Sequence, residues 1–213
     1  MNTATQSKQD TATVTLDAAQ FSAAIKAADL SRGHDKALPM LTVYRIELAD
    51  NKLQFITTDR YRLSVISLNL DDTAAATLAA SGLFNDGGLN IDGDTLTAAS
   101  KIKTQKGQSL ILQLTPQGLD LTVHNTQQHA PVYDCDYPKW RNILDMQSKE
   151  QSTTGNYNPR YLSDAAKACE IIAGKDAKNT PLNITLRGNY PATLTAKADG
   201  LHIELLLMPV SVR

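Results

Sequence analysis

The order strand, helix, strand, strand, strand recurs three times along the chain, at intervals of roughly sixty residues. In the first pass, residues 12–16 alternate apolar and polar side chains as a half-buried strand does. Asp17 then offers a helix N-cap. A stripe at helical spacing follows, made of Phe21, Ala24, Ile25 and Ala28. Three runs with strand character complete the pass, at residues 40–48, 52–58 and 62–70.

The second and third passes repeat this order with weak sequence similarity. Residues 71–80, rich in Ala and Thr, are expected to form a linker after the first pass. In the third pass Asn158 offers an N-cap, and Pro159 stands at the first helical position, where a missing N–H costs nothing. The expected elements are strand 87–91, helix 95–106 ending at Gly107, strands 109–114, 119–124 and 130–133, strand 153–157, helix 159–173 ending at Gly174, and strands 182–186, 192–196 and 201–208.

One such unit lays a single helix on a small sheet and cannot bury its apolar face alone. The repeat therefore predicts an α+β protein of three βαβββ units, in which side-by-side sheets form an outer layer and helices cover the other face. Periodicity alone is also compatible with a plain α+β domain. Only similarity to a known family can distinguish the three-unit architecture from a plain α+β domain.

Composition limits the function more than the fold. The formal net charge is −1, so any surface that faces nucleic acid must be a local patch. Cys135 and Cys169 lie far apart without metal-ligand spacing, which favours a reducing cytoplasm over a disulfide framework. No stretch approaches the roughly 18 apolar residues of a membrane span, so we expect a cytoplasmic protein with no membrane partner.

Four segments resemble one family, in that family's order. Thr57-Thr58-Asp59-Arg60-Tyr61-Arg62-Leu63 is similar to its segment "ATDxxRL", and Tyr137-Pro138-Lys139-Trp140-Arg141-Asn142-Ile143-Leu144 to its interdomain connector "FPDYRRVLP". Tyr157-Asn158-Pro159-Arg160-Tyr161-Leu162-Ser163-Asp164-Ala165 is similar to its helix start "FNPRYLLDAL", and Leu207-Met208-Pro209-Val210-Ser211-Val212-Arg213 to its C-terminal "VMPxRL". The chain thus resembles the bacterial DNA polymerase III beta sliding clamp, in a shortened form that would suit a virus as well as a cell.

The resemblance implies a DNA clamp fold with sheets outside and helices inside. The family has three domains of two units each, so its first domain and the first half of its third domain have no counterpart here. The expected divisions are a flexible tail at 1–11, a clamp domain at 12–145 (units 12–70 and 86–136, connector 137–145), and a third unit, half a clamp domain, at 150–213.

The resemblance also implies partners. A homo-oligomeric ring would encircle double-stranded DNA without sequence specificity and tether a DNA polymerase and other proteins with clamp-binding motifs, with a clamp loader as a further partner. If the family's ring holds about twelve units, four copies of this chain would supply them. A mixed ring with a host clamp is an alternative, as is a non-encircling module or decoy that captures clamp-binding peptides.

A hydrophobic pocket for partner peptides is implied at the positions that match the family's motifs. An apolar trough with nearby Arg side chains suits a short peptide, although ordinary core packing also explains the apolar members. Arg60 and Tyr61 stand where the family often has small or His residues, and Asn142 replaces a typical Arg, so partner preference is expected to differ. The implied pocket residues are Leu41, Thr58, Arg60, Tyr61, Arg62, Leu63, Pro138, Asn142, Ile143, Met208, Pro209, Val210 and Arg213.

Cations lie away from the apolar stripe on each predicted helix. Such a face is either solvated or, in a clamp, directed at DNA phosphates, where contacts are independent of sequence. The predicted DNA-facing residues are Lys26, Arg32, Lys101, Lys103, Lys106, Arg160, Lys167, Lys175 and Lys178.

No arrangement of residues points to catalysis, a metal or a cofactor. The four histidines, His34, His124, His129 and His202, lack metal-ligand spacing. Asp92 and Asp94 lack the glutamate of a calcium loop and are better explained by a turn with an N-cap. Asp134 and Asp136 precede the connector, which favours a structural loop over paired catalytic acids. We therefore expect a protein that is not an enzyme.

Overall fold

The computed structural model describes residues 11–85, 87–101, 107–145, 152 and 154–210. The strands are β1 (Ala12–Asp17), β2 (Val43–Ala49), β3 (Lys52–Thr58), β4 (Arg62–Asn69), β5 (Leu89–Asp92), β6 (Ser109–Thr115), β7 (Gly118–Val123), β8 (Thr126–Pro131), β9 (Asn183–Thr185), β10 (Ala192–Ala198) and β11 (Leu201–Leu207). The α-helices are α1 (Ala18–Asp29), α2 (Asp72–Ser81), α3 (Gly93–Ala99), α4 (Trp140–Asp145) and α5 (Pro159–Ala173). Short 3-10 helices lie at Pro39–Leu41 and Gly174–Asp176.

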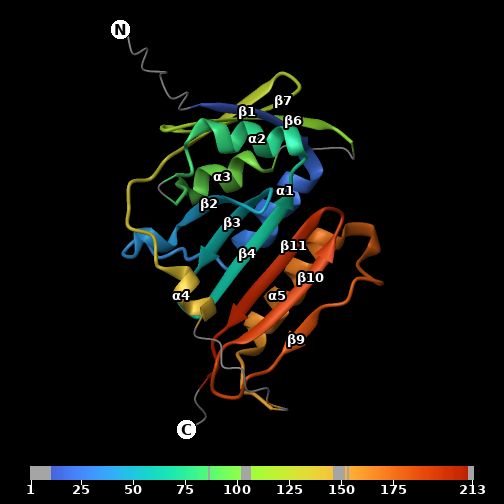
Figure 1. The fold of residues 1–213 in the computed structure, drawn as a ribbon. Helices are drawn as coiled ribbons and strands as arrows, with labels where there is room; N and C mark the ends of the chain where they lie inside the picture. Colours follow the sequence, from blue (N-terminus) through green and yellow to red (C-terminus); the bar gives the residue numbers. More distant parts are fainter. Residues whose placement is uncertain (1–10, 86, 102–106, 146–151, 153, 211–213) are drawn as a thin grey trace, which may run out of the picture.

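Two antiparallel sheets organise these elements (Figure 1). The smaller sheet has the order β1-β6-β7-β8, and the larger has the order β5-β2-β3-β4-β11-β10-β9. Helices α1 and α5 pack against each other on one face of the larger sheet, α1 on β3 and β4 and α5 on β10 and β11. The predicted α+β class is confirmed.

The first two units exchange their first strands. β1 pairs with β6 of the second unit, and β5 of the second unit pairs in return with β2. Such a reciprocal exchange relates the two units by a local two-fold axis. The third unit joins through β4 and β11, each the last strand of its unit, which pair antiparallel with Leu63 opposite Leu206. Because equivalent strands meet antiparallel with their helices on the same face, this junction is also a local two-fold, and neighbouring units point in opposite directions.

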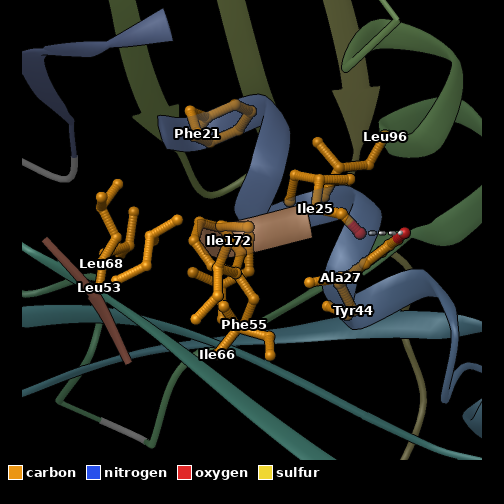
Figure 2. Packing of buried hydrophobic residues seen from close by; sticks show 14 of the residues in the cluster. Phe21, Ile25, Ala27, Tyr44, Leu53, Phe55, Ile66, Leu68, Leu96 and Ile172 are labelled. Carbon is orange, nitrogen blue, oxygen red and sulfur yellow. Dashed lines mark hydrogen bonds between the residues drawn. The ribbon is translucent and has the colours of Figure 1, made fainter. Parts of the chain in front are cut away.

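One apolar core joins all three units. Figure 2 shows Phe21 and Ile25 of α1 and Ile172 of α5 packed over Phe55 and Ile66 of the larger sheet. The rings of Phe21 and Phe55 meet edge to face, with their centroids 5.6 Å apart. Full burial of one such side chain contributes about 1.5–3 kcal/mol. The helical stripe predicted for the first unit is therefore the centre of the molecule.

The opposite face of the larger sheet carries a second, smaller apolar cluster. Its buried members are Ile56, Leu63, Val65, Leu206 and Trp140. Trp140 belongs to α4, which is part of the connector, and its Nε1 donates a hydrogen bond to Oε1 of the buried Glu47 at 3.2 Å. The connector thus folds back over strands that would otherwise expose apolar side chains to water.

A helix forms where a linker was predicted. The carboxylate of Asp71 accepts a hydrogen bond from the Ala74 N–H at 2.7 Å, and α2 ends at Gly82, whose φ of 76° only glycine adopts freely. Leu78 is fully buried in the main core. The prediction was wrong because alanine, which gave the segment its low complexity, is also the best helix former.

The third unit has its predicted helix but no first strand. α5 covers the predicted residues 159–173, and Asn158 caps it by accepting from the Arg160 N–H at 2.9 Å. Residues 154–157 of the predicted strand 153–157 form no strand, and residue 153 lies outside the described part. The reason is topological: β1 and β5 each pair with a strand of the other unit, and the third unit has no exchange partner among the described residues.

Other boundaries moved by a few residues. The helix predicted at 95–106 begins earlier, at Gly93, and ends at Ala99, and residues 102–106 lie outside the described part. The strand predicted at 130–133 is β8, which begins at Thr126. Of the predicted tail, residues 1–10 lie outside the described part. Within the described residues no helix has the length and apolarity to cross a membrane.

Candidate functional site

An apolar pocket of about 390 Å³ opens where β4, β11 and α4 meet. Leu63 and Leu206 face each other across the β4–β11 ladder, Ile143 approaches from α4, and Met208 follows β11. The pocket is the part of the outer apolar cluster that α4 leaves uncovered. Its lining residues are Thr58, Arg60, Arg62, Leu63, Ile143, Asn189, Tyr190, Pro191, Leu206 and Met208.

Large apolar side chains stand exposed around this pocket. Tyr61 is 54% exposed, Tyr190 49% and Met208 39%. Isolated exposed apolar residues are ordinary, but a group that rims a hollow marks a binding surface. A flexible thioether such as that of Met208 also adapts to different partner side chains.

The turn between β3 and β4 is fixed by the side chain of Asp59. Its Oδ1 accepts hydrogen bonds from the N–H groups of Tyr61 and Arg62, both at 3.0 Å. The Thr58 hydroxyl donates to the Arg62 carbonyl at 2.7 Å and accepts from the Arg60 N–H at 3.2 Å. These contacts hold one wall of the pocket in a set shape and leave Arg60 with a φ of 80°.

Arg62 ties this turn to the third unit. Its Nε lies 2.8 Å from Asp59 Oδ2, and its Nη1 lies 2.6 Å from Asp164 Oδ2 on α5. The guanidinium also sits 4.5 Å from the ring centroid of Tyr161, which stacks on Tyr61 at 6.3 Å. The Arg62–Asp164 ion pair and the contacts of the Tyr161 ring therefore hold the two units together beside the pocket, and the two carboxylates neutralise the charge of Arg62.

Exposed cations lie on the helices that cover the larger sheet. Lys26 is the exposed cation in the last turn of α1, and Arg160 and Lys167 lie seven positions apart on one side of α5. Lys101, which follows α3, and Lys175 and Lys178, which follow α5, are also exposed. Of the remaining predicted DNA-facing residues, Lys103 and Lys106 lie outside the described part of the chain.

Arg32 does not belong to that set. Only 3% of its side chain is exposed, and it pairs with Asp29 at 2.7 Å and Asp94 at 3.2 Å. Burial alone would raise the pKa of Asp29, but the hydrogen bond and charge of Arg32 outweigh it, so this pKa lies below its usual value. Arg32 also donates to the Thr42 carbonyl at 3.0 Å. Its prediction as a DNA-facing residue was wrong, because it joins α1 to the start of α3.

Comparison with known proteins gives these features a family. Residues 15–139 match the family described as DNA polymerase III beta subunit, central domain. The chain belongs to this family. The beta sliding clamp of Micrococcus luteus is 25% identical over 171 residues, which make up 80% of this chain and 51% of that relative. The chain therefore spans about half the length of the curated relative it matches.

Solved structures of DNA polymerase sliding clamps share the fold. The clamp from Caulobacter crescentus superposes with a TM-score of 0.72 at 14% identity, over 98% of this chain and 68% of that chain. The clamp from Bacillus subtilis superposes with a TM-score of 0.70 at 14% identity, over 94% of this chain and 64% of that chain. The predicted sliding-clamp fold is confirmed.

Some of the pocket residues implied by the beta-clamp resemblance line this pocket, and others do not. Those that line the pocket are Thr58, Arg60, Arg62, Leu63, Ile143 and Met208. Leu41 is not among the lining residues: it is buried, and the Gly33 N–H donates to the carbonyls of both Leu41 and Thr58. Tyr61 lies beside the pocket, with its carbonyl accepting from the Met208 N–H at 2.9 Å.

The remaining predicted residues lie elsewhere. Pro138 and Asn142 line a separate polar cavity of about 440 Å³ beside the connector, next to Glu47 and its partner Arg45. Pro209 and Val210 continue past the pocket, where the Val210 N–H donates to the Asn156 carbonyl at 2.8 Å. Arg213 lies outside the described part of the chain.

Four lining residues were missed. Asn189, Tyr190 and Pro191 belong to the loop between β9 and β10, which none of the four similar segments covers. The tyrosine next to a proline in this loop is the sequence signal that could have indicated a binding surface there. Leu206 follows from strand alternation, because it lies on the side of β11 opposite to Leu205 and Leu207.

Proposed function

We propose that this member of the beta-clamp family is a DNA sliding clamp that tethers a DNA polymerase through the pocket beside Leu63 and Leu206. The observation that carries the proposal is an apolar pocket at a junction between two clamp units, rimmed by exposed Tyr190 and Met208. Such a site binds a short peptide by its apolar side chains. The protein acts as a tether and not as an enzyme, and it works in the cytoplasm.

The DNA-facing surface would be the exposed side of α1 and α5. Lys26, Arg160 and Lys167 are exposed there, and no ion pair of the described residues involves them. Contacts from such cations to phosphates carry no sequence information and weaken with salt, which suits a protein that slides along duplex DNA. A net charge of −1 is no obstacle when the cations gather on one surface.

The ring would be a homotetramer, placed on DNA by a clamp loader. Three units per chain and about twelve per ring give four copies. Strand β8 at one end of the smaller sheet and β9 at one end of the larger leave unpaired edges in the described part of the chain, and unpaired edges invite association.

Retention on DNA tests the ring. The purified full chain, loaded onto nicked circular DNA, is expected to stay bound through gel filtration at moderate salt and to slide off after the circle is linearised. Light scattering on the same sample is expected to give the mass of four chains. A protein that stays monomeric and holds neither DNA form contradicts encirclement.

A second candidate function survives that result. The lining residues of the pocket all belong to one chain, so a clamp-like module that does not encircle DNA could still capture clamp-binding peptides as a decoy or regulator. Failure of the retention experiment together with tight peptide binding would favour this candidate over a clamp.

Peptide binding tests the pocket itself. Met208→Asp is expected to weaken binding of a labelled peptide from a bacterial replicative polymerase's clamp-binding segment by roughly tenfold to a hundredfold, because an apolar contact worth about 1.5–3 kcal/mol is lost. Removal of residues 208–213 should abolish it. Ile111→Asp, which places the same charge at an exposed isoleucine of β6, is the matched control and should bind like the wild type. Equal affinities for all the variants would exclude this pocket.

A further inference from the structure

The backbone of Arg60 adopts a conformation that is energetically unfavourable for arginine. Its φ of 80° lies in the left-handed region, which glycine occupies freely and other L-residues occupy at a steric cost. The hydrogen bonds of Asp59 and Thr58 impose this geometry on the turn. A non-glycine residue kept at such a position commonly serves a site, and here the site is the apolar pocket that Arg60 lines.

The side chain of Arg60 is exposed, and its charge has no acidic partner among the described residues. Its guanidinium lies 5.8 Å from the ring centroid of Tyr61, and none of the ion pairs in the described part of the chain includes it. Arg62, the other arginine of the lining, is neutralised by Asp59 and Asp164. The pocket therefore presents an apolar floor of Leu63 and Leu206 beside one uncompensated cation.

We propose that Arg60 makes this pocket selective for peptides that carry a carboxylate next to their apolar anchor residues. The inference rests on the proposed peptide-binding function and names the chemistry of its ligand. Arginine forms charge-assisted hydrogen bonds with carboxylates, and the half-apolar surroundings of the pocket strengthen them relative to open water. The carboxylate comes either from an Asp or Glu side chain or from the peptide's C-terminus.

A panel of labelled peptides measures this preference. Each peptide carries one Leu-Phe pair in a Gly-Ser background. One member has Asp beside the pair and another has Asn there, and a further two place the pair at the C-terminus, as a free acid or as an amide. At low salt the wild type is expected to prefer the charged member of at least one pair by roughly threefold to fivefold, and the pair that shows the preference identifies the source of the carboxylate.

Arg60→Gly separates charge from fold. In this variant the affinities for the charged and uncharged peptides should converge, while the Tm should rise because glycine relieves the backbone strain. Arg60→Lys should keep part of the preference. Lys197→Gln, which removes a cation from the exposed side of β10, should keep all of it and so exclude an effect of net charge.

The outcomes separate this inference from the function on which it rests. A wild type that binds the panel without preferring either carboxylate, or an Arg60→Gly variant that keeps the wild-type preference, overturns the role of Arg60 and leaves the pocket standing. If neither this panel nor the polymerase peptide binds the wild type, the proposed pocket fails and the inference fails with it.

Discussion

His202 lies on the outer face of β11, directly opposite Lys197 in the β10–β11 ladder. Burial and the charges of Lys197 and Lys52 lower the pKa of its imidazole below the usual 6.5. Because the folded state disfavours the protonated ring, the unfolded chain takes up this proton more readily. The free energy of unfolding should therefore fall as the pH drops through 6.5 toward the lowered pKa of the folded state.

Replacing this histidine should flatten that dependence. We expect His202→Gln to lose less stability than the wild type between pH 7.5 and 5.5, by less than about 1 kcal/mol because the side chain is partly solvated. Urea unfolding across this range measures the slope. Identical slopes in His202→Gln and the wild type would contradict the assignment.

Single residues were predictable where a short segment decides their role, and not where distant contacts do. Leu63 and Met208 were found from local similarity, and both line the pocket. Lys26 and Arg32 were indistinguishable in the sequence, as cations off the same apolar stripe. Arg32 is buried because its guanidinium lies over the buried ring of Tyr44, which is remote in sequence. Tyr190 was missed because nothing local places its loop next to β11.

Helix α2 gives a test at the level of the element. Asp71→Ala removes the N-cap and should lower the free energy of unfolding by about 1 kcal/mol. Asp72→Ala, one position later, removes only a favourable charge near the helix start and should cost less, about 0.3–1 kcal/mol. Urea titrations of the two variants compare them directly. A larger loss for Asp72→Ala would mean that Asp71 does not act as the cap.

Elements were predictable where local chemistry both starts and ends them. α5 has Asn158 and Pro159 at its start and Gly174 at its end, and its predicted range is correct. The absent strand before α5 is the opposite case, since residues 154–157 include Gly155 and Asn156, which disfavour a strand, and have no partner strand among the described residues. Strands exist only as pairs, so a chain with an odd number of exchanging units cannot complete them all internally.

Strand β8 is where chains of the proposed ring should meet. β4, β8 and β11 are each the last strand of their unit. β4 and β11 pair with each other, whereas β8 has a free edge in the described part of the chain. Its residues Thr126–Pro131 include no lysine and no acidic residue to guard that edge. We therefore expect β8 of one chain to pair with β8 of another.

Added charge at this edge should divide the ring. Gln127→Lys together with Gln128→Lys places like charges on both sides of a β8–β8 contact, and light scattering should show the mass falling from four chains to two. Gln113→Lys, on the internal strand β6, is the matched control and should leave the mass unchanged. A double variant that keeps the full mass would exclude β8 from the contacts.

The opposed directions of neighbouring units set the symmetry of such a ring. With three units per chain, the unit that follows the third must point the other way, so each successive chain has to be turned over. Like then meets like at every junction: β8 with β8, and third unit with third unit. The closed assembly would have no front or back, and polymerases could dock with equal ease on whichever side faces the growing strand.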